Sequence, residues 1–154
     1  MPKSAFELAR ATFFDAEKVL RAMDNATRKS LSKAGAYVRQ RARSSIRTRK
    51  QTSAPGQPPS DHGGALKRLL FFAYDQPSRS VVIGPTLFEG SARAGQSVPA
   101  PKALEIGGPV TATTRKGRHL NLTYRARPFM GPALAAEAAA GTIAEQFRGS
   151  LAEG

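Results

Sequence analysis

The side chains that could do acid–base or metal chemistry in this 154-residue chain are two histidines and a few scattered carboxylates. His62 follows Ser60 and Asp61, and His119 stands apart from them. A catalytic triad is defined by where its members meet in space, and adjacent loop residues do not supply that arrangement. A metal site needs three or four ligands of matched geometry, which a chain without cysteine hardly offers. We therefore expect no catalytic residue, no metal ligand and no cofactor site.

The other candidates for chemistry are equally weak. The spacing of the glycines after residue 83 matches neither the dinucleotide-binding fingerprint nor the phosphate-binding loop. Glu89 and Glu105 have no spacing that would orient them as a general acid and a general base. The sequence thus favours a binding or structural protein over an enzyme.

Positive charge is the strongest chemical feature of the chain. It has 24 Lys and Arg residues against 11 Asp and Glu residues, a formal net charge of +13. No acidic residue lies between Asp24 and Asp61, a stretch that holds much of the excess. Such charge repels itself and indicates a polyanion or an acidic protein as partner. The candidate contact residues are Arg39, Arg41, Arg43, Arg47, Arg49 and Lys50.

The spacing of these residues predicts a basic ridge. Arg39, Arg43 and Arg47 follow one another at four-residue steps on one face of a helix. Such a ridge can track phosphates, and roughly six to ten contacts would make binding strongly dependent on salt. The chain has no recognised base-reading motif and no interleaved aromatic residues for stacking on bases. The charge alone therefore fits phosphate and acidic protein equally well.

The first fifty residues are expected to form the helix that carries this ridge. Apolar residues recur at three- and four-residue steps from Phe6 to Ala42 and draw one stripe along it. An unbroken helix over 4–49 would be about 70 Å long, more than a compact domain of this size needs. Part of the stripe is therefore expected to pack on another subunit. A break near Asn25 or Gly35, both poor helix formers, is the alternative.

A segment rich in proline and glycine follows the helix over residues 51–64. Its prolines lack N–H donors and its glycines loosen the backbone, so it cannot be the interior of a helix or strand. We expect an extended arm that reaches a neighbouring subunit. The residues assigned to this contact are Ala54, Pro55, Gly56, Gln57, Pro58 and Pro59.

Residues 65–128 are predicted to form a small antiparallel sheet with a loop over 86–101. Turn-forming residues at 75–79 and 115–118 each separate two apolar runs and predict two hairpins. Val81–Ile83 has the apolar composition of a buried strand.

The segment over 129–150 is predicted to be a helix that packs on this sheet. Apolar residues from Leu134 to Phe147 recur on one helical side, and Gly149 is a stop signal. Residues 103–106 are expected to be a short strand or turn. The order of long helix, small sheet and helix predicts a single α+β domain over 1–154.

Five short motifs follow the basic helix in a fixed order. By these motifs and their order, the chain resembles the neck and tail-completion proteins of tailed bacteriophages, the group that includes lambda's minor tail protein Z. The resemblance extends over residues 28–150. The motifs are Ser-Ala-Pro-Gly-Gln-Pro-Pro at 53–59, Gly-Ala-Leu-Lys at 64–67, Ser-Val-Val-Ile-Gly-Pro at 80–85, Leu-Glu-Ile-Gly-Gly at 104–108 and Arg-Ala-Arg-Pro-Phe-Met-Gly-Pro-Ala-Leu at 125–134.

The resemblance implies a structural virion protein without enzymatic activity, assembled in the bacterial cytoplasm. Copies of it would form a ring of six, or of twelve, at the head–tail junction. The ring would join the portal or head-closure side to the tail terminator or tail tube around the DNA path, with non-specific DNA contact. No membrane is expected, since no apolar run approaches the ~20 residues that a span needs. The alternative function is a basic DNA- or RNA-binding accessory protein.

The motifs also suggest structural roles. Pro128, with Arg127 before it, is expected to end the last strand, because proline cannot donate a ladder hydrogen bond. Phe129 is expected to be core beneath the C-terminal helix, as phenylalanine usually is. Glu105 is expected to pair with Arg127 or with an arginine of an adjacent subunit.

Overall fold

The fold of this chain is α+β, as the sequence predicts. The computed structural model describes residues 16–86, 100–113, 117–148 and 150. The expected helix before residue 16, Glu89 and the tip of the second hairpin lie outside these residues. The elements are α2 (Ala16–Ser45), α3 (Ala65–Arg68), β1 (Leu70–Asp75), β2 (Ser80–Pro85), α4 (Ala100–Ile106), β3 (Gly108–Thr113), β4 (His119–Tyr124), α5 (Met130–Ala139) and α6 (Thr142–Glu145).

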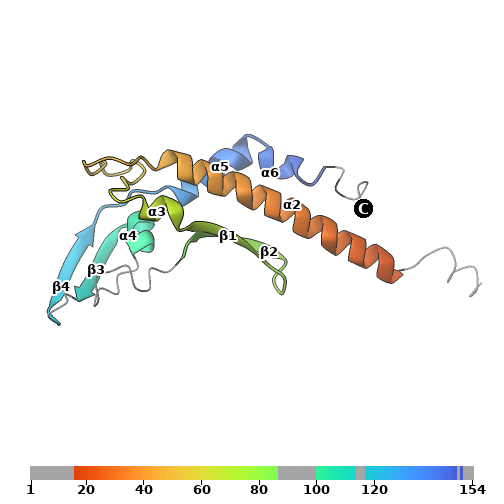
Figure 1. The fold of residues 1–154 in the computed structure, drawn as a ribbon, viewed down its shortest axis with the longest axis horizontal. Coiled ribbons are helices and arrows are strands. Elements are labelled where there is room, and N and C mark those ends of the chain that lie inside the picture. The colour runs from red at the N-terminus through yellow and green to blue at the C-terminus, as the bar shows by residue number, and fades with distance from the viewer. Residues whose placement is uncertain (1–15, 87–99, 114–116, 149, 151–154) are drawn as a thin grey trace, which may run out of the picture.

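Helix α2 is the longest element and projects beyond the other elements at its N-terminal end, while the β3–β4 hairpin lies beyond its C-terminal end (Figure 1). Its 30 residues correspond to about 45 Å. It continues through Asn25 and Gly35, so the predicted alternative of a break is wrong. A Cβ at Gly35 would lie 2.8 Å from Val81 Cγ2 and 3.2 Å from Phe72 Cδ2. This glycine is therefore needed for close packing of the β1–β2 hairpin, and packing outweighs its poor helix propensity.

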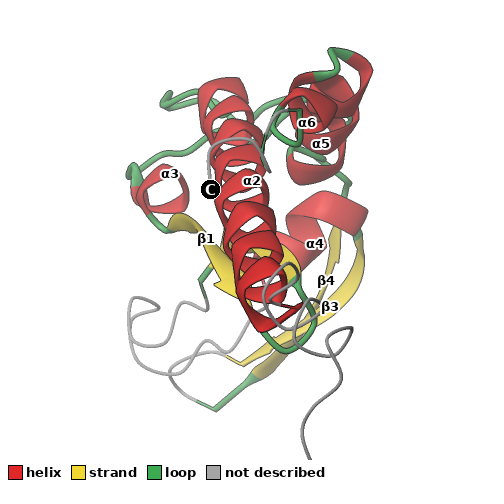
Figure 2. Cartoon of the chain, turned by 90° about the vertical axis from the view of Figure 1, so that its right-hand side faces the viewer, coloured by secondary structure: helices red, strands yellow, loops and turns green. Residues whose placement is uncertain are grey.

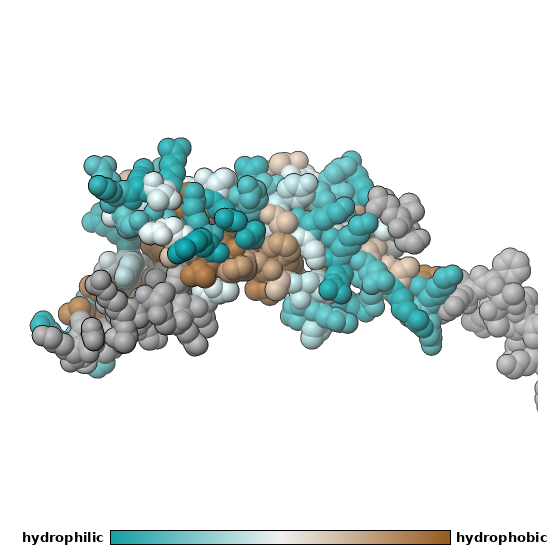
Figure 3. All heavy atoms as spheres, viewed as in Figure 1, coloured by the Kyte–Doolittle hydropathy of each residue, from teal (hydrophilic) through white to brown (hydrophobic). Residues whose placement is uncertain are grey.

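The strands form two separate antiparallel hairpins rather than one sheet. In the first, Phe72 of β1 lies opposite Ile83 of β2, and both side chains are half-buried. Val82 between its half-buried neighbours is 62% exposed, so the prediction of a fully buried strand is wrong. Alternate side chains point to opposite faces of a strand, and only one face of this hairpin packs on α2. Figure 3 shows apolar side chains gathered over this hairpin.

The C-terminal region packs on α2, not on a sheet as predicted (Figure 2). Two helices replace the single helix expected over 129–150, because Gly141 adopts a left-handed φ of 73° between α5 and α6. Residues 103–106 belong to helix α4, which begins at Ala100 inside the expected 86–101 loop. Pro101 stands in its first turn, where the missing N–H of proline costs nothing.

The core lies toward the C-terminal end of α2, where α3, β1 and α5 meet. It contains Phe129, which is 1% exposed and thereby confirms the prediction for this residue. At the other end of α2, Leu20 and Met23 are 59% and 46% exposed. One apolar stripe thus serves two purposes, since its later turns are core and its first turns face outward. The core residues are Val38, Ala42, Ile46, Leu66, Leu70, Phe129 and Ala133.

Candidate functional site

The basic residues near the end of α2 do not form the single ridge that their spacing predicts. Arg39 turns toward β1, where its Nε donates a hydrogen bond of 2.6 Å to the Leu70 carbonyl. Its guanidinium carbon lies 5.8 Å from the centroid of the Phe71 ring. Arg39 is thus a structural contact between α2 and β1.

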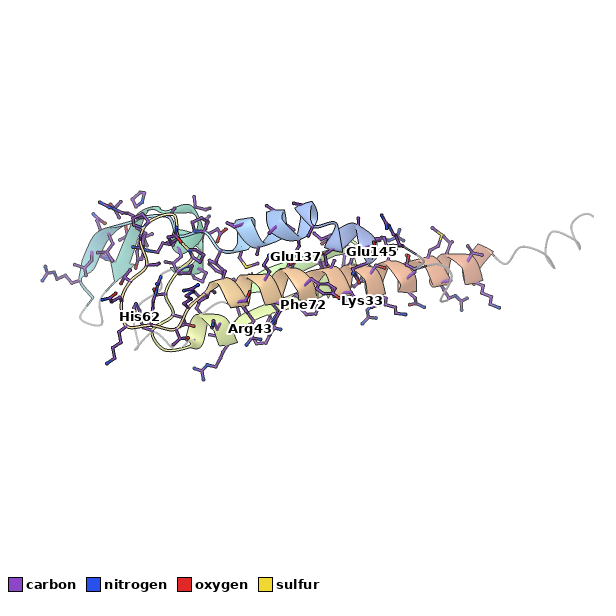
Figure 4. The ribbon with its side chains drawn as sticks, turned by 90° about the horizontal axis from the view of Figure 1, so that it is seen from above. Lys33, Arg43, His62, Phe72, Glu137 and Glu145 are labelled. Atoms are coloured by element: carbon purple, nitrogen blue, oxygen red, sulfur yellow. The ribbon has the colours of Figure 1, made fainter. Side chains whose placement is uncertain are left out.

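Arg41 points to α5, where its Nε donates to Oε1 of Glu137. The Glu137 side chain is 7% exposed, whereas that of Arg41 is 46% exposed. This hydrogen bond is the largest of the effects that lower the pKa of Glu137, and a bond from the Thr142 side chain lowers it further. Figure 4 shows Glu137 between α5 and α2, and Arg43 on the opposite side of α2. Two of the six candidate arginines and lysines therefore hold the fold together.

The exposed remainder of the basic cluster lies just beyond α2, which ends at Ser45. Arg47, Arg49 and Lys50 are all exposed, although Arg47 no longer continues a helical face. The main chain here pairs with the segment after the proline-rich stretch, because the N–H of Asp61 donates to the Arg47 carbonyl at 3.0 Å. This pairing fixes the backbone from which the cations project.

Arg47 and Arg49 line a polar pocket of about 370 Å³. The other lining residues are Ser44, Ser45, Gln57 and Pro58. Arg49 is fixed there by a 2.8 Å hydrogen bond from its Nε to Ser60 Oγ. Guanidinium groups beside hydroxyl and amide groups suit a carboxylate or a phosphate, since they offer charged donors in a fixed geometry. This basic pocket is the part of the predicted ridge that the fold leaves available to a partner.

The proline-rich arm lies against its own chain at both ends of residues 53–59. Ser53 is 4% exposed and its carbonyl accepts a 2.9 Å hydrogen bond from Arg127 Nε. Farther along, the N–H of Gly56 donates to the Ala126 carbonyl at 2.9 Å. Pro59 is buried and Pro58 half-buried. The residues that remain exposed for contact with a neighbour are Ala54, Pro55, Gly56 and Gln57.

Glu105 caps helix α5. The predicted pair between Glu105 and Arg127 does not form. Its Oε2 accepts hydrogen bonds from the N–H groups of Phe129 and Met130 at 2.9 and 3.1 Å. Its Oε1 accepts the N–H of Gly131 at 2.7 Å. The first N–H groups of a helix lack partners within the helix and carry partial positive charge, so a carboxylate is favoured there. For the Glu105 carboxylate, pairing with Arg127 is less favourable than accepting hydrogen bonds from these three backbone N–H groups.

Arg127 instead joins three segments of the chain. Besides the bond to Ser53, its own N–H donates to the Leu104 carbonyl at 2.6 Å, and its Nη1 donates to the Arg125 carbonyl at 3.3 Å. Strand β4 ends at Tyr124, before Arg127 is reached, so the prediction that Pro128 ends the strand is wrong, and Pro128 is a half-buried residue outside any strand.

The residues that might suggest hydrolysis have structural contacts. Asp61 is 5% exposed and its Oδ2 accepts the N–H of Lys67 at 2.9 Å. His62 is exposed and donates from Nδ1 to the Arg49 carbonyl at 2.8 Å. Within the described residues there is no group of three His, Asp or Glu side chains that could hold a metal ion.

Two features of the site were not predicted from the sequence. The role of Glu137 depends on α5 packing against α2, and nothing in an alanine-rich segment indicates that neighbour. The cap by Glu105 has the same origin, because its helix was expected to be a strand or turn. The one sequence signal that could have suggested the cap is the presence of an acidic residue, Glu105, in the motif that precedes the predicted C-terminal helix.

Comparison with protein-family models, with curated proteins and with solved structures finds no match for this chain. Among the residues that the structure describes, no helix combines the length and the apolar character that a bilayer span requires.

Proposed function

We propose that this chain is a structural protein of the head–tail junction of a tailed bacteriophage or a related particle. Copies of it form a ring of six or twelve around the DNA path, between the portal or head-closure side and the tail terminator or tail tube. The protein belongs to the virion and assembles in the bacterial cytoplasm.

One observation carries the proposal: motifs that are distant in sequence meet in one structural unit. Glu105 of the fourth motif caps the helix that the fifth motif begins. Arg127 of the fifth motif binds the Ser53 carbonyl of the first motif. Leu66 of the second motif is in the same core cluster as Phe129. Motifs that interlock in this way specify one fold, so their joint resemblance to the neck proteins is stronger than that of each alone.

Two surface features support a role in assembly. Exposed apolar side chains on the first turns of α2 are typical of a contact with another subunit. The basic pocket at the other end suits an acidic protein neighbour or the phosphates of the genome. We favour acidic protein, because a conduit that held DNA strongly would hinder its passage.

The contacts of Arg39 and Arg41 weaken the alternative of a nucleic-acid-binding protein. Four of the predicted cationic contact residues remain available to a partner: Arg43, Arg47, Arg49 and Lys50. With about four phosphate contacts on duplex DNA, log Kobs would fall against log salt with a slope of roughly −4. The alternative predicts this binding in isolation and no association with particles.

The test is removal of the gene from the phage that carries it. The proposal predicts filled heads and complete tails that remain separate, with joining restored when the purified chain is added. Normal infectious particles without the chain would overturn the proposal. Tight DNA binding at low salt, together with absence from particles, would favour the alternative.

A further inference from the structure

The first turns of α2 carry an apolar surface that the other described parts of the chain leave exposed. Val19, Leu20 and Met23 are 42%, 59% and 46% exposed, and we call these three residues the end patch. They lie on the part of α2 that projects beyond the other elements (Figure 1). Large apolar side chains gathered on one helical face indicate a binding surface more than scattered ones do.

A groove of about 370 Å³ opens on the same molecule between α2, β2 and the α5–α6 pair. Every residue that lines it is apolar or glycine, and the largest are Leu31, Ile83, Met130, Leu134 and Ile143. Leu134 at its rim is 50% exposed. A groove without polar groups suits apolar side chains presented by a helix better than a polar small molecule.

A second copy of the chain suits this groove, because its end patch offers large apolar side chains on a helical face and the groove lining is entirely apolar. At a formal net charge of +13, two copies repel each other unless they meet on surfaces without excess charge. Residues 17–24 of α2 have no net charge of their own, since Glu17 and Asp24 balance Lys18 and Arg21, and Asp24 also pairs with Arg79 at 3.2 Å. The groove is also uncharged. A contact between these two surfaces leaves the basic pocket, at the far end of α2, away from the contact.

We propose that the end patch of one copy docks into the groove between α2, β2 and α5–α6 of the next copy. The two surfaces are different, so a bound pair of copies still presents one unoccupied end patch and one unoccupied groove. Such head-to-tail contacts generate a ring where the rotation closes. This inference rests on the proposed function, for which it supplies the contact between subunits.

The decisive experiment uses two variants of the full-length chain that each lose one of the two surfaces. The patch variant carries Leu20→Glu and Met23→Glu, and the groove variant carries Leu134→Glu and Ile143→Glu. Light scattering and native mass spectrometry measure the mass, and circular dichroism verifies the fold. Wild type is expected to form a closed species larger than a dimer. Each variant alone is expected to be monomeric, with self-association weakened roughly tenfold or more.

Mixing the two variants distinguishes head-to-tail docking from a two-fold dimer. The intact patch of the groove variant fits the intact groove of the patch variant, so the mixture is expected to form a 1:1 complex of about 32.8 kDa, twice 16.4 kDa. A mixture that stays monomeric overturns the proposal. So does a wild-type chain that is monomeric at its highest soluble concentration, or a patch variant that assembles like wild type.

Val82→Glu is the matched control, because Val82 is 62% exposed on the outer face of β2 and lies outside the groove lining. It adds one negative charge, against two in each double variant, at an exposed apolar site and is expected to assemble like wild type. If it too is monomeric, the loss comes from added charge in general and the docking site is refuted. Head-to-tail assembly by a chain that is absent from particles would refute the proposed function and leave this docking intact.

Discussion

At the scale of single residues, some charged side chains that the sequence predicts to contact partners instead bind groups of their own chain. Glu105 holds three N–H groups at the start of α5, and Arg41 holds Glu137 between α2 and α5. Both carboxylates bind donors in their own chain. These contacts leave the net charge of +13 unchanged, but Arg39 and Arg41 bind groups of their own chain, so fewer cationic side chains are available to partners than the sequence suggests.

Removal of the Glu105 carboxylate should destabilise the domain. Glu105→Ala leaves three helix N–H groups without their acceptor, and the loss of a cap costs about 1–2 kcal/mol of unfolding free energy. Urea unfolding followed by circular dichroism measures this change. Lys102→Ala, an exposed change on the same helix α4, is the control and should be neutral. Equal stability of the two variants would show that the cap contributes nothing.

The Arg41–Glu137 pair predicts a dependence of stability on pH. The hydrogen bond from Arg41 holds the pKa of Glu137 below its ordinary value, so folding favours the ionised carboxylate. The stabilisation is thus complete above the unfolded-state pKa and is lost as the pH falls through the lowered folded-state value. Melting temperatures of wild type and Glu137→Gln should differ at neutral pH and converge in acid. A constant difference across this range would contradict the assignment.

At the scale of elements, the sequence predicts what local patterns determine and misses what tertiary contacts determine. The α2 stripe and both hairpins follow from periodicity and turn residues, and the structure confirms them. Glycine is needed at position 35 because Val81 and Phe72 pack closely against it, and both residues are distant in sequence. Likewise, α4 is a short helix whose Glu105 side chain serves a helix that begins 25 residues later, at Met130. Patterns within one segment carry no information about such partners.

Gly107 tests how tightly α4 is joined to the segment after β4. It has a φ of +74°, and a Cβ there would lie 2.9 Å from the Ala126 backbone nitrogen. Gly107→Ala should destabilise the fold by about 1–3 kcal/mol, because backbone strain adds to the clash. Gly117→Ala is the matched control, since its φ is +73° but nothing lies within 4 Å of the added atom. Thermal unfolding should show a larger loss for Gly107→Ala, and equal losses would refute the close approach.

At the scale of the whole molecule, the surface divides into an apolar end and a basic end. The end patch lies on the first turns of α2, and the basic pocket lies beyond its last turn. In the proposed ring the end patch is covered by the next copy, so the basic pocket is the surface that remains available to a neighbouring protein or to DNA. Of the basic ridge predicted from the sequence, the part that is exposed together in the structure lies at this one pocket.

The basic pocket should matter for assembly and not for folding. A triple change to alanine of the pocket residues Arg47 and Arg49 and of Arg43, which lies in the last turn of α2 outside the pocket lining, is expected to keep the melting temperature within a few degrees and to impair the joining of heads to tails. Arg39→Ala is the contrasting variant, because it removes the bond to the Leu70 carbonyl and should lower stability. Normal joining by the triple variant would show that the pocket has no role in assembly.

The most direct test of the central claim is electron microscopy of intact particles in which this chain carries a label. Our account predicts density for the label in one ring at the head–tail junction, with six or twelve copies around the DNA path. Label on the capsid or along the tail, or particles that lack the chain, would contradict it.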